Sequence, residues 1–273
     1  MDSAIAKSQA EPRSVDPVWS KVREAAQATA AAEPVLAGTL HATVLSQSRF
    51  EGALSYHLAR LAGTTEVPAA LIRQTFDEAF AADARIGLAA RADIVAVTER
   101  DPACTSHLDP LLWFKGYHAL QTYRVAHWLW INGRHALAHY LQSRASSLFG
   151  VDIHPGAVIG KGIFIDHGTG VVIGETAVVE DGVSMLHGVT LGGTGKEWED
   201  RHPKIRYGVM IGAGAKILGN IEVGHCARIA AGSVVIKPVP NNVTVAGVPA
   251  KVVGQAGCPE PARTMDQMFL DEV

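Results

Sequence analysis

The second half of the chain repeats with a period of six residues. Every sixth position from Ile153 to Val189 holds a small or branched aliphatic residue, and a second run with the same spacing extends from Ile211 to Val235. An α-helix cannot keep a strict period of six, and a simple strand of period two does not need glycine at fixed offsets. The repeat therefore predicts a parallel β-helix, in which each face of a triangular coil takes about six residues and the corners favour small side chains.

The first half of the chain has a different composition. Of the 27 glycines, 21 lie between Gly150 and Gly257, so a domain boundary is expected near residues 149 and 150. Before this boundary, helix-forming residues dominate and apolar residues recur at spacings of three and four, which predicts helices. These helices are expected to begin near Pro17 and Pro34, and then to cover residues 50–61, 68–82, 86–98, 110–132 and 134–148.

A polar segment interrupts the six-residue repeat. The separation of Val189 from Ile211 is not a multiple of six, and the residues between them include GGTGKEWEDRHPK at 192–204. We expect a loop to leave the coil over residues 192–206, and loops that project from a repeat scaffold commonly carry functional residues. The expected domains are a disordered start over 1–14, a helical domain over 15–149, the β-helix over 150–254 and a flexible tail over 255–273.

Composition excludes several classes of protein. Hydrophobic residues make up 48% of the chain and charged residues 19%, which is enough apolar material for a core. The net charge of −3 rules out a broadly basic surface for nucleic acid. The sequence has neither a run near the ~20 apolar residues of a membrane span nor the apolar region of a signal peptide. Three widely spaced cysteines without a CxxC motif argue against a disulfide framework or a cysteine zinc site, so a reducing cytoplasm is expected.

Several segments together resemble the bacterial serine O-acetyltransferases, a family of left-handed β-helix acyltransferases. The matching segments are RDPA at 100–103, KGYHALQ at 115–121, VDIHP at 151–155, DHGTG at 166–170, VTLGGTGK at 189–196 and RHPK at 201–204. The resemblance implies an α+β fold, with an all-helical N-terminal domain followed by a left-handed parallel β-helix of hexapeptide repeats and a projecting loop. It also implies transfer of the acetyl group of acetyl-CoA to L-serine, giving O-acetyl-L-serine and CoA, without a permanently bound cofactor. This reaction is the first step of cysteine biosynthesis from serine, and feedback inhibition by L-cysteine is expected.

Acetyl transfer to an alcohol needs a base that removes the hydroxyl proton, and histidine suits this task near neutral pH. His167 is the candidate base, because it follows Asp166 where the aliphatic phase of the repeat switches. A second carboxylate can fix the tautomer of such a base. The resemblance assigns this role to Asp152, in a site between neighbouring subunits of a trimer, since Asp152 lies too far from His167 within one coil. The alternatives are a surface histidine at a corner and an aspartate that caps the helix-to-coil junction.

The resemblance also assigns the groups that hold the substrates. Asp101 and Asp166 are expected to bind the ammonium of serine, and Arg201 and His202 its carboxylate. The alternatives are a turn residue before Pro102 and a solvated charged loop. His187 stands where close relatives are expected to have glutamine. Coenzyme A is expected in a groove along the coils, near Gly193, Ala213, Ala231, Lys237 and Lys251; the glycine-rich segment 192–196 does not fit a nucleotide-binding P-loop.

The resemblance makes two further statements about partners. It implies a homohexamer, in which the helical domains join two trimers. It implies that the tail ending in Val273 binds O-acetylserine sulfhydrylase, against the alternative of a frayed terminus. No metal site, nucleic acid or membrane partner is expected.

Three other functions compete with serine acetylation. The first is an acetyltransferase on the same scaffold that modifies a sugar or an antibiotic, which should lack the helical domain and the Asp101 and Arg201–His202 pieces. The second is a zinc enzyme of the γ-carbonic anhydrase type, which needs three converging histidines. The third is a non-catalytic scaffold, which would not turn over acetyl-CoA.

Overall fold

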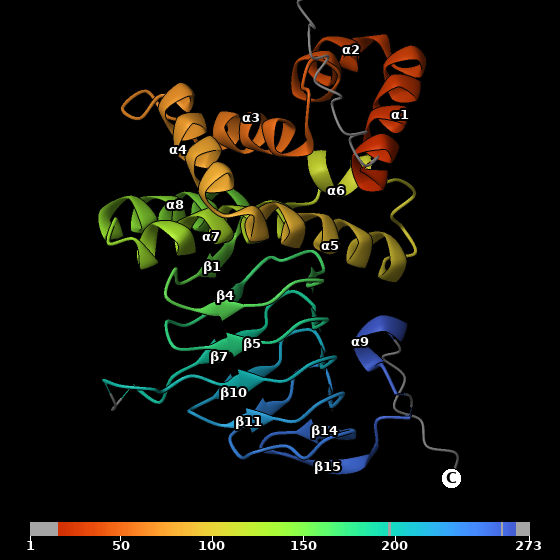
Figure 1. The fold of residues 1–273 in the computed structure, drawn as a ribbon. Helices are drawn as coiled ribbons and strands as arrows, with labels where there is room; N and C mark the ends of the chain where they lie inside the picture. The colour runs from red at the N-terminus through yellow and green to blue at the C-terminus, as the bar shows by residue number, and fades with distance from the viewer. Residues whose placement is uncertain (1–15, 196–197, 258, 266–273) are drawn as a thin grey trace, which may run out of the picture.

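A helical domain sits on one end of a parallel β-helix (Figure 1). The structure is a computed structural model that describes residues 16–195, 198–257 and 259–265. The order of helices followed by β-helix confirms the expected architecture. The helices are α1 (Pro17–Ala32), α2 (Pro34–Leu40), the π-helical turn η1 (His41–Leu45), α3 (Phe50–Ala62), α4 (Ala69–Ala82), α5 (Ala84–Arg100), α6 (Leu108–Leu112), α7 (Lys115–Ile131) and α8 (His135–Phe149).

Local signals set both ends of the helical domain. Asp16 caps α1 by accepting a hydrogen bond from the backbone N–H of Trp19 at 3.1 Å, and Pro17 occupies the first helical position. At the other end, Gly150 has φ 68° directly after α8, which is the left-handed conformation that ends helices and favours glycine. The chain then enters the first strand at Val151.

The single helix predicted over residues 110–132 is wrong. The structure has two helices there, α6 and α7, which are separated at Trp113 and Phe114. Phe114 adopts an extended backbone, and its side chain packs against the core clusters of both the helical domain and the site region. Apolar periodicity cannot reveal this break, because α6 and α7 are both apolar.

The predicted limits of the loop and of the tail also differ from the structure. Gly192 ends strand β7 and Lys204 begins strand β8, so the loop covers 193–203 rather than 192–206. Gln255 belongs to the last strand, and the predicted flexible tail contains a short helix, α9 (Pro261–Thr264), which packs against α5 and the coil. The predicted disordered residues 1–14 and the last eight residues lie outside the described part of the chain.

Three sheets form the faces of the β-helix in the described residues. Sheet A contains β1 (Val151–Ile153), β4 (Val171–Ile173), β7 (Thr190–Gly192), β10 (Lys216–Leu218) and β13 (Val234–Val235). Sheet B contains β2 (Val158–Ile159), β5 (Val178–Val179), β8 (Lys204–Ile205) and β11 (Glu222–Val223). Sheet C contains β3 (Phe164–Ile165), β6 (Ser184–Met185), β9 (Met210–Ile211), β12 (Arg228–Ile229), β14 (Val243–Gly247) and β15 (Ala250–Gln255), of which β15 alone is antiparallel.

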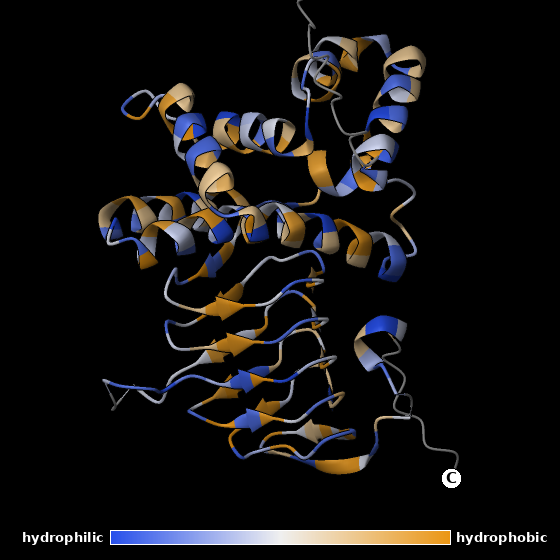
Figure 2. Ribbon diagram, in the orientation of Figure 1, coloured by the Kyte–Doolittle hydropathy of each residue, from blue (hydrophilic) through white to orange (hydrophobic). Residues whose placement is uncertain are grey.

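Aliphatic side chains from all three sheets fill the coil. The inward positions form one continuous buried cluster that extends to α7 and α8. Figure 2 shows hydrophobic residues on the strands of the first coils and hydrophilic residues on the loop that projects after β7. The aliphatic positions of the hexapeptide pattern are therefore the residues that form the core of the coil.

Two corners of the coil are longer than their neighbours. Ile153 pairs with Ile173, whereas Ile173 pairs with Leu191, so the first coil is two residues longer than the second. The registers of sheets B and C place these two residues between β3 and β4. The second long corner lies between β7 and β8, where the loop leaves the coil.

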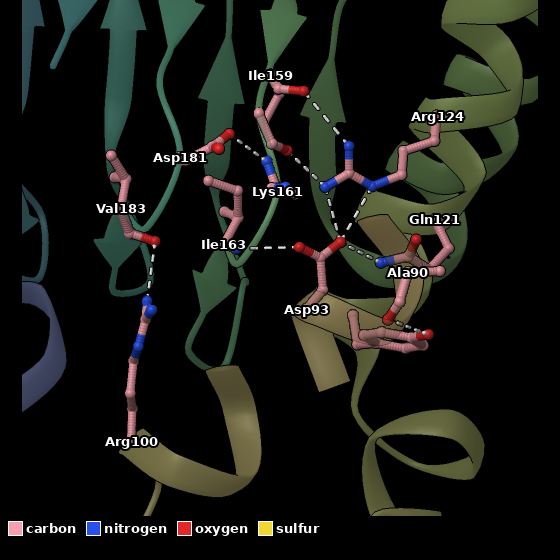
Figure 3. Close-up of polar contacts among 12 residues, drawn as sticks. Ala90, Asp93, Arg100, Gln121, Arg124, Ile159, Lys161, Ile163, Asp181 and Val183 are labelled. Atoms are coloured by element: carbon pink, nitrogen blue, oxygen red, sulfur yellow. Dashed lines mark hydrogen bonds and ion pairs between the residues drawn. The ribbon is translucent and has the colours of Figure 1, made fainter. Parts of the chain in front are cut away.

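A buried ion pair fastens the helical domain to the first coil (Figure 3). Asp93 of α5 has no exposed side-chain surface and accepts hydrogen bonds from Gln121 and from Nε and Nη2 of Arg124, at 2.7–3.0 Å. Its other oxygen accepts the backbone N–H of Ile163 in the coil at 3.0 Å. Arg124 also donates to the carbonyl oxygen of Gly160 at 2.7 Å. The carboxylate thus fixes α5, α7 and the coil relative to one another.

The helical domain has a separate core that contains two histidines. His57 and His118 lie with their ring centroids 4.9 Å apart, and His118 is 4% exposed. Burial lowers the pKa of His57 to about 4, with the charge of Arg60 acting in the same direction. Burial and the neighbouring His57 lower the pKa of His118 to about 3. Among the described residues, no helix is both long and apolar enough to span a membrane.

The two buried histidines predict acid sensitivity. Their pKa values in the folded state lie below the ordinary value near 6.5, so below that pH the unfolded chain binds protons that the folded chain excludes. The free energy of unfolding should fall as the pH drops from about 6.5 to 4, by roughly 2–3 kcal/mol per pH unit for the pair. Urea unfolding at several pH values measures this slope. His118→Gln should reduce the slope by about half, and an unchanged slope would contradict the assignment.

Candidate active site

His167 lies in the long corner between β3 and β4. Its backbone has φ 55°, and Gly168 and Gly170 beside it also have positive φ. A left-handed conformation at a non-glycine residue costs about 1–2 kcal/mol. The turn is held by the backbone N–H of Thr169, which donates to the carbonyl oxygen of His167 at 2.9 Å. The His167 side chain is 74% exposed, so this strained turn presents the imidazole to solvent.

Asp166 and Asp101 line the same pocket as His167, which has a volume of about 370 Å³. Oδ2 of Asp166 is 3.8 Å from Nε2 of His167. Burial raises the pKa of Asp166; the charge of His167 opposes this shift and the charge of Asp101 adds to it. The charge of Asp101 thus disfavours ionisation of Asp166, and a bound cation would relieve this repulsion.

Asp101 also has the alternative role considered from the sequence, that of a turn residue before Pro102. It follows the last residue of α5, and its Oδ1 accepts the backbone N–H of Ala103 at 2.8 Å. The turn and the pocket are not exclusive roles, because the same hydrogen bond holds the carboxyl group at the pocket wall.

The start of α7 covers the turn that carries His167. A Cβ atom at Gly116 would lie 2.1 Å from the carbonyl oxygen of Ile165, so the helix backbone approaches β3 as closely as glycine allows. The ammonium of Lys115 donates to Oγ1 of Thr169 in the turn. α7 therefore forms one side of the pocket and restricts the turn.

Arg201 and His202 lie at the end of the loop, where the chain enters β8. His202 is 7% exposed, and its Nδ1 accepts the backbone N–H of Thr176 at 3.2 Å. Oγ1 of Thr176 accepts the backbone N–H groups of Arg201 and His202 at 3.0 and 3.1 Å. Nη2 of Arg201 donates to Oε2 of Glu175 at 2.6 Å. Two residues of the corner after β4 thus hold the loop end.

This corner is suited to an anion. Burial, followed by the charge of Arg201, lowers the pKa of His202 and favours the neutral ring. Because Nδ1 accepts a hydrogen bond, the proton of that neutral ring lies on Nε2, which can donate. The hydrogen bond from Arg201 lowers the pKa of Glu175, so the guanidinium is anchored by an ionised carboxylate. A carboxylate ligand could use the remaining donors of both side chains.

Asp152 does not line the His167 pocket, and its charge acts on His154 at the corner after β1. It lies on β1, and its Oδ1 accepts Nε2 of Gln142 at 2.8 Å. Asp152, Glu175 and Arg201 all act on His154, whose pKa is lowered chiefly by burial. In the part of the chain that the structure describes, no hydrogen bond or ion pair joins Asp152 to His167.

The expected site residues therefore form two groups on opposite edges of sheet A. His167 lies at the edge shared with sheet C, and Arg201 and His202 lie at the edge shared with sheet B. One chain does not bring the two groups together.

The residues expected to contact coenzyme A divide between the same two edges. The strand registers align Ala213 and Ala231 below His167 and His187 at the first edge. The rings of His167 and His187 meet edge to face, with centroids 5.9 Å apart. At the second edge lie Gly193 and Lys237, whereas Lys251 lies on β15 at the end of the coil.

Residues that could hold a metal are not grouped in the described ranges, 16–195, 198–257 and 259–265: no three His, Cys, Asp or Glu side chains lie together suitably. The histidines needed by the zinc alternative do not converge within this part of one chain.

Comparison with known proteins identifies the family. A model of the N-terminal region of serine acetyltransferases matches residues 18–122. The serine acetyltransferase of Salmonella typhimurium is 56% identical over 252 residues, which cover 92% of both chains. The crystal structure of serine acetyltransferase from Vibrio cholerae superposes with a TM-score of 0.91 at 57% identity, covering 92% of this chain and 98% of that one. The chain belongs to the serine acetyltransferase family.

Two further serine acetyltransferase structures were solved with ligands. The enzyme from Brucella abortus in complex with coenzyme A has a TM-score of 0.88 and 57% identity, covering 89% of this chain and 98% of that one. A serine acetyltransferase in complex with cysteine has a TM-score of 0.91 and 52% identity, covering 93% and 98%. The family and the acyltransferase activity expected from the sequence motifs are confirmed, and the competing functions lose their support.

Some residues of the candidate site were not found from the sequence. Glu175 and Thr176 hold Arg201 and His202, and Gln142 holds Asp152. The register of the repeat aligns Glu175 with Gly193 at the same corner, so the hexapeptide pattern could have pointed to Glu175. Gln142 lies on a helix outside the repeat, so nothing in the pattern points to it.

Gly174 allows the His202 ring to pack against the coil. A Cβ atom at this position would lie 2.0 Å from Nε2 of His202. Gly174→Ala should displace the ring and raise the KM for serine by at least about tenfold, because one or two hydrogen bonds to the substrate are lost. Steady-state kinetics measures this change. The control is Gly38→Ala on α2, where a Cβ atom meets nothing within 4 Å; an unchanged KM in Gly174→Ala would contradict the assigned role of His202.

Proposed function

We propose that this chain acetylates the hydroxyl of L-serine in a site shared between two neighbouring subunits. The observation that supports this arrangement is the separation of the two groups of polar residues at opposite edges of sheet A. In a cyclic trimer, one edge of each subunit meets the other edge of its neighbour, so three complete sites arise. His167, Asp166 and Asp101 come from one subunit, and Asp152, Arg201 and His202 come from the next.

The charges of the two groups match the two ends of an amino acid. The ammonium of serine lies between Asp101 and Asp166, whose mutual repulsion favours a cation. The carboxylate of serine accepts hydrogen bonds from Arg201 and from Nε2 of His202. These two anchors hold the hydroxyl group near His167, and such positioning supplies much of the catalytic advantage.

His167 then acts as the general base. It takes the hydroxyl proton as the serine oxygen attacks the thioester carbonyl of acetyl-CoA, and Asp152 of the neighbouring subunit orients the ring and stabilises the imidazolium. Collapse of the tetrahedral intermediate breaks the carbon–sulfur bond. The imidazolium returns the proton to the departing thiolate, so O-acetyl-L-serine and CoA leave and the base is restored.

Coenzyme A occupies the groove that runs along the coil below His167. Ala213 and Ala231 form its small-residue floor. Gly193 and Lys237 lie at the other edge of sheet A, so the neighbouring subunit supplies them, and Lys251 adds a cationic group at the end of the coil. The serine acetyltransferase of Brucella abortus was solved with coenzyme A, which supports this class of ligand. Acetyl-CoA is a co-substrate here rather than a resident cofactor.

L-cysteine competes with L-serine in this site as the feedback inhibitor of the pathway. It presents the same ammonium and carboxylate groups to the same side chains, and a relative was solved in complex with cysteine.

Two trimers join through their helical domains into a hexamer. The tail ending in Val273, which lies outside the described residues, binds O-acetylserine sulfhydrylase, and the enzyme works in the cytoplasm.

The acceptor specificity tests the proposed activity. Thiol release from acetyl-CoA should depend on L-serine and should be weak with L-homoserine, a sugar or no acceptor. His167→Ala should lower kcat by roughly 10²–10⁴-fold while acetyl-CoA binds nearly as well, because a general base acts on the chemical step. Thiol release with a sugar but not with serine, or a fully active His167→Ala variant, would refute the assignment.

Mixed trimers test the shared site. Co-expression of His167→Ala and Arg201→Ala chains should restore activity to about a quarter of the wild-type level. In a random mixture, about a quarter of the interfaces join the intact His167 half of one chain to the intact Arg201 half of the other. Each variant alone should be nearly inactive.

The matched control mixes His167→Ala with Asp166→Ala. Both changes affect the same half of the site, so no interface can be complete and activity should stay absent. Equal recovery in both mixtures, or a monomeric mass in solution, would contradict a site between subunits.

A further inference from the structure

A side-chain amide from the helical domain holds the carboxylate of Asp152. Gln142 lies on α8, about two helical turns before that helix ends at Phe149, and the chain then enters β1 at Val151. Its Nε2 donates to Oδ1 of Asp152 at 2.8 Å. The structure describes no other hydrogen bond to this carboxylate within its resolved ranges, so Oδ2 remains available to a further donor.

The orientation of the Gln142 amide is fixed at both ends. Its Oε1 lies 3.1 Å from Nδ1 of His139, one turn earlier on the same helix. An imidazole N–H can donate to that oxygen, whereas the opposite orientation would place the amide oxygen against the Asp152 carboxylate. The amide must therefore direct its N–H groups towards Asp152.

Aromatic rings support this amide in turn. The His139 ring packs edge to face on Trp130 and on His154, with centroid distances of 5.2 and 5.5 Å. Trp130 also contacts His154 at 5.1 Å. The exposed His139 ring beside the amide thus contacts α7 and the corner after β1. The titratable and charged groups around Asp152 and His154 are His139, Glu175 and Arg201.

We infer that Gln142 is a positioning residue for catalysis, which sets the rotamer of Asp152 so that Oδ2 faces the base of the neighbouring subunit. This inference rests on the proposed role of Asp152. A free carboxylate at the end of a side chain rotates about two bonds, and a hydrogen bond to one oxygen removes much of that freedom. Because Asp152 acts on a base that arrives from another chain, its orientation must exist before the subunits meet.

The test compares Gln142→Met with wild type. Methionine keeps the length of the side chain but has no donor, so the Asp152 carboxylate loses its restraint. We expect kcat to fall about tenfold, as for the loss of one hydrogen bond to a charged group. The KM values for serine and acetyl-CoA should change by less than about twofold, because Gln142 binds neither substrate. A packing role would change the assembly and the thermal stability instead.

A double-mutant cycle separates positioning from a general effect. In an Asp152→Ala background, Gln142→Met should change kcat by less than about twofold, since the group it positions is absent. If the fold-losses of kcat from the two single variants multiplied in the double variant, the inference would be overturned. Ser147→Ala on the exposed face of α8, where the hydroxyl bonds only within the helix, is the matched control and should resemble wild type.

Two further comparisons keep the result decisive. If Gln142→Met does not assemble, Gln142→Glu tests the same hydrogen bond, because an ionised carboxylate of the same shape cannot donate. Suppose that wild type acetylates serine and that Asp152→Ala is impaired. An unchanged kcat in Gln142→Met would then overturn this inference while leaving the proposed function intact. A wild-type protein that does not acetylate serine would overturn the proposed function as well.

Discussion

The buried carboxylate of Asp93 is the contact on which the geometry of the whole molecule depends. It holds α5, α7 and the first coil in one hydrogen-bonded unit, and its own side chain has no exposed surface. Removing one partner of such a pair costs about 3–5 kcal/mol, because a charge is left buried and unpaired. α5 ends at the residue before Asp101, and α7 begins over the His167 turn. The part of the proposed site that contains Asp101 and His167 is therefore placed by an ion pair that lies outside the pocket.

The breaks in the six-residue repeat are as informative as the repeat itself. The pattern predicts the coil because each face must fill a narrow interior with aliphatic side chains. Both departures from the pattern carry site residues: two extra residues form the His167 turn, and the loop after β7 ends in Arg201 and His202. A regular coil has no room for extra residues at a corner, so His167, Arg201 and His202 of the proposed site lie where the period fails.

Other parts of the structure could not be predicted from the sequence, for physical reasons. The break before α7 exists because Phe114 must reach two cores at once, and periodicity within one helix does not record that. α9 is held through backbone oxygens, including that of Ala262, which accepts the hydroxyl of Ser184 at 2.7 Å, and such contacts leave no pattern in side-chain type. The separation of the site into two edges depends on strand register across coils. Only the motif resemblance suggested that two subunits would be needed.

The antiparallel strand at the far end of the coil also limits how these molecules can aggregate. A stack of parallel strands ends in an unpaired backbone edge, which is a template for growth into fibres. Here β15 folds back on β14 and reverses the strand direction, so another parallel coil cannot continue the register (Figure 1). Lys251 stands exposed on that strand, and a lysine on an edge disfavours a further strand beside it. With the helical domain covering the opposite end, the coil is a solenoid of fixed length that resists end-to-end polymerisation.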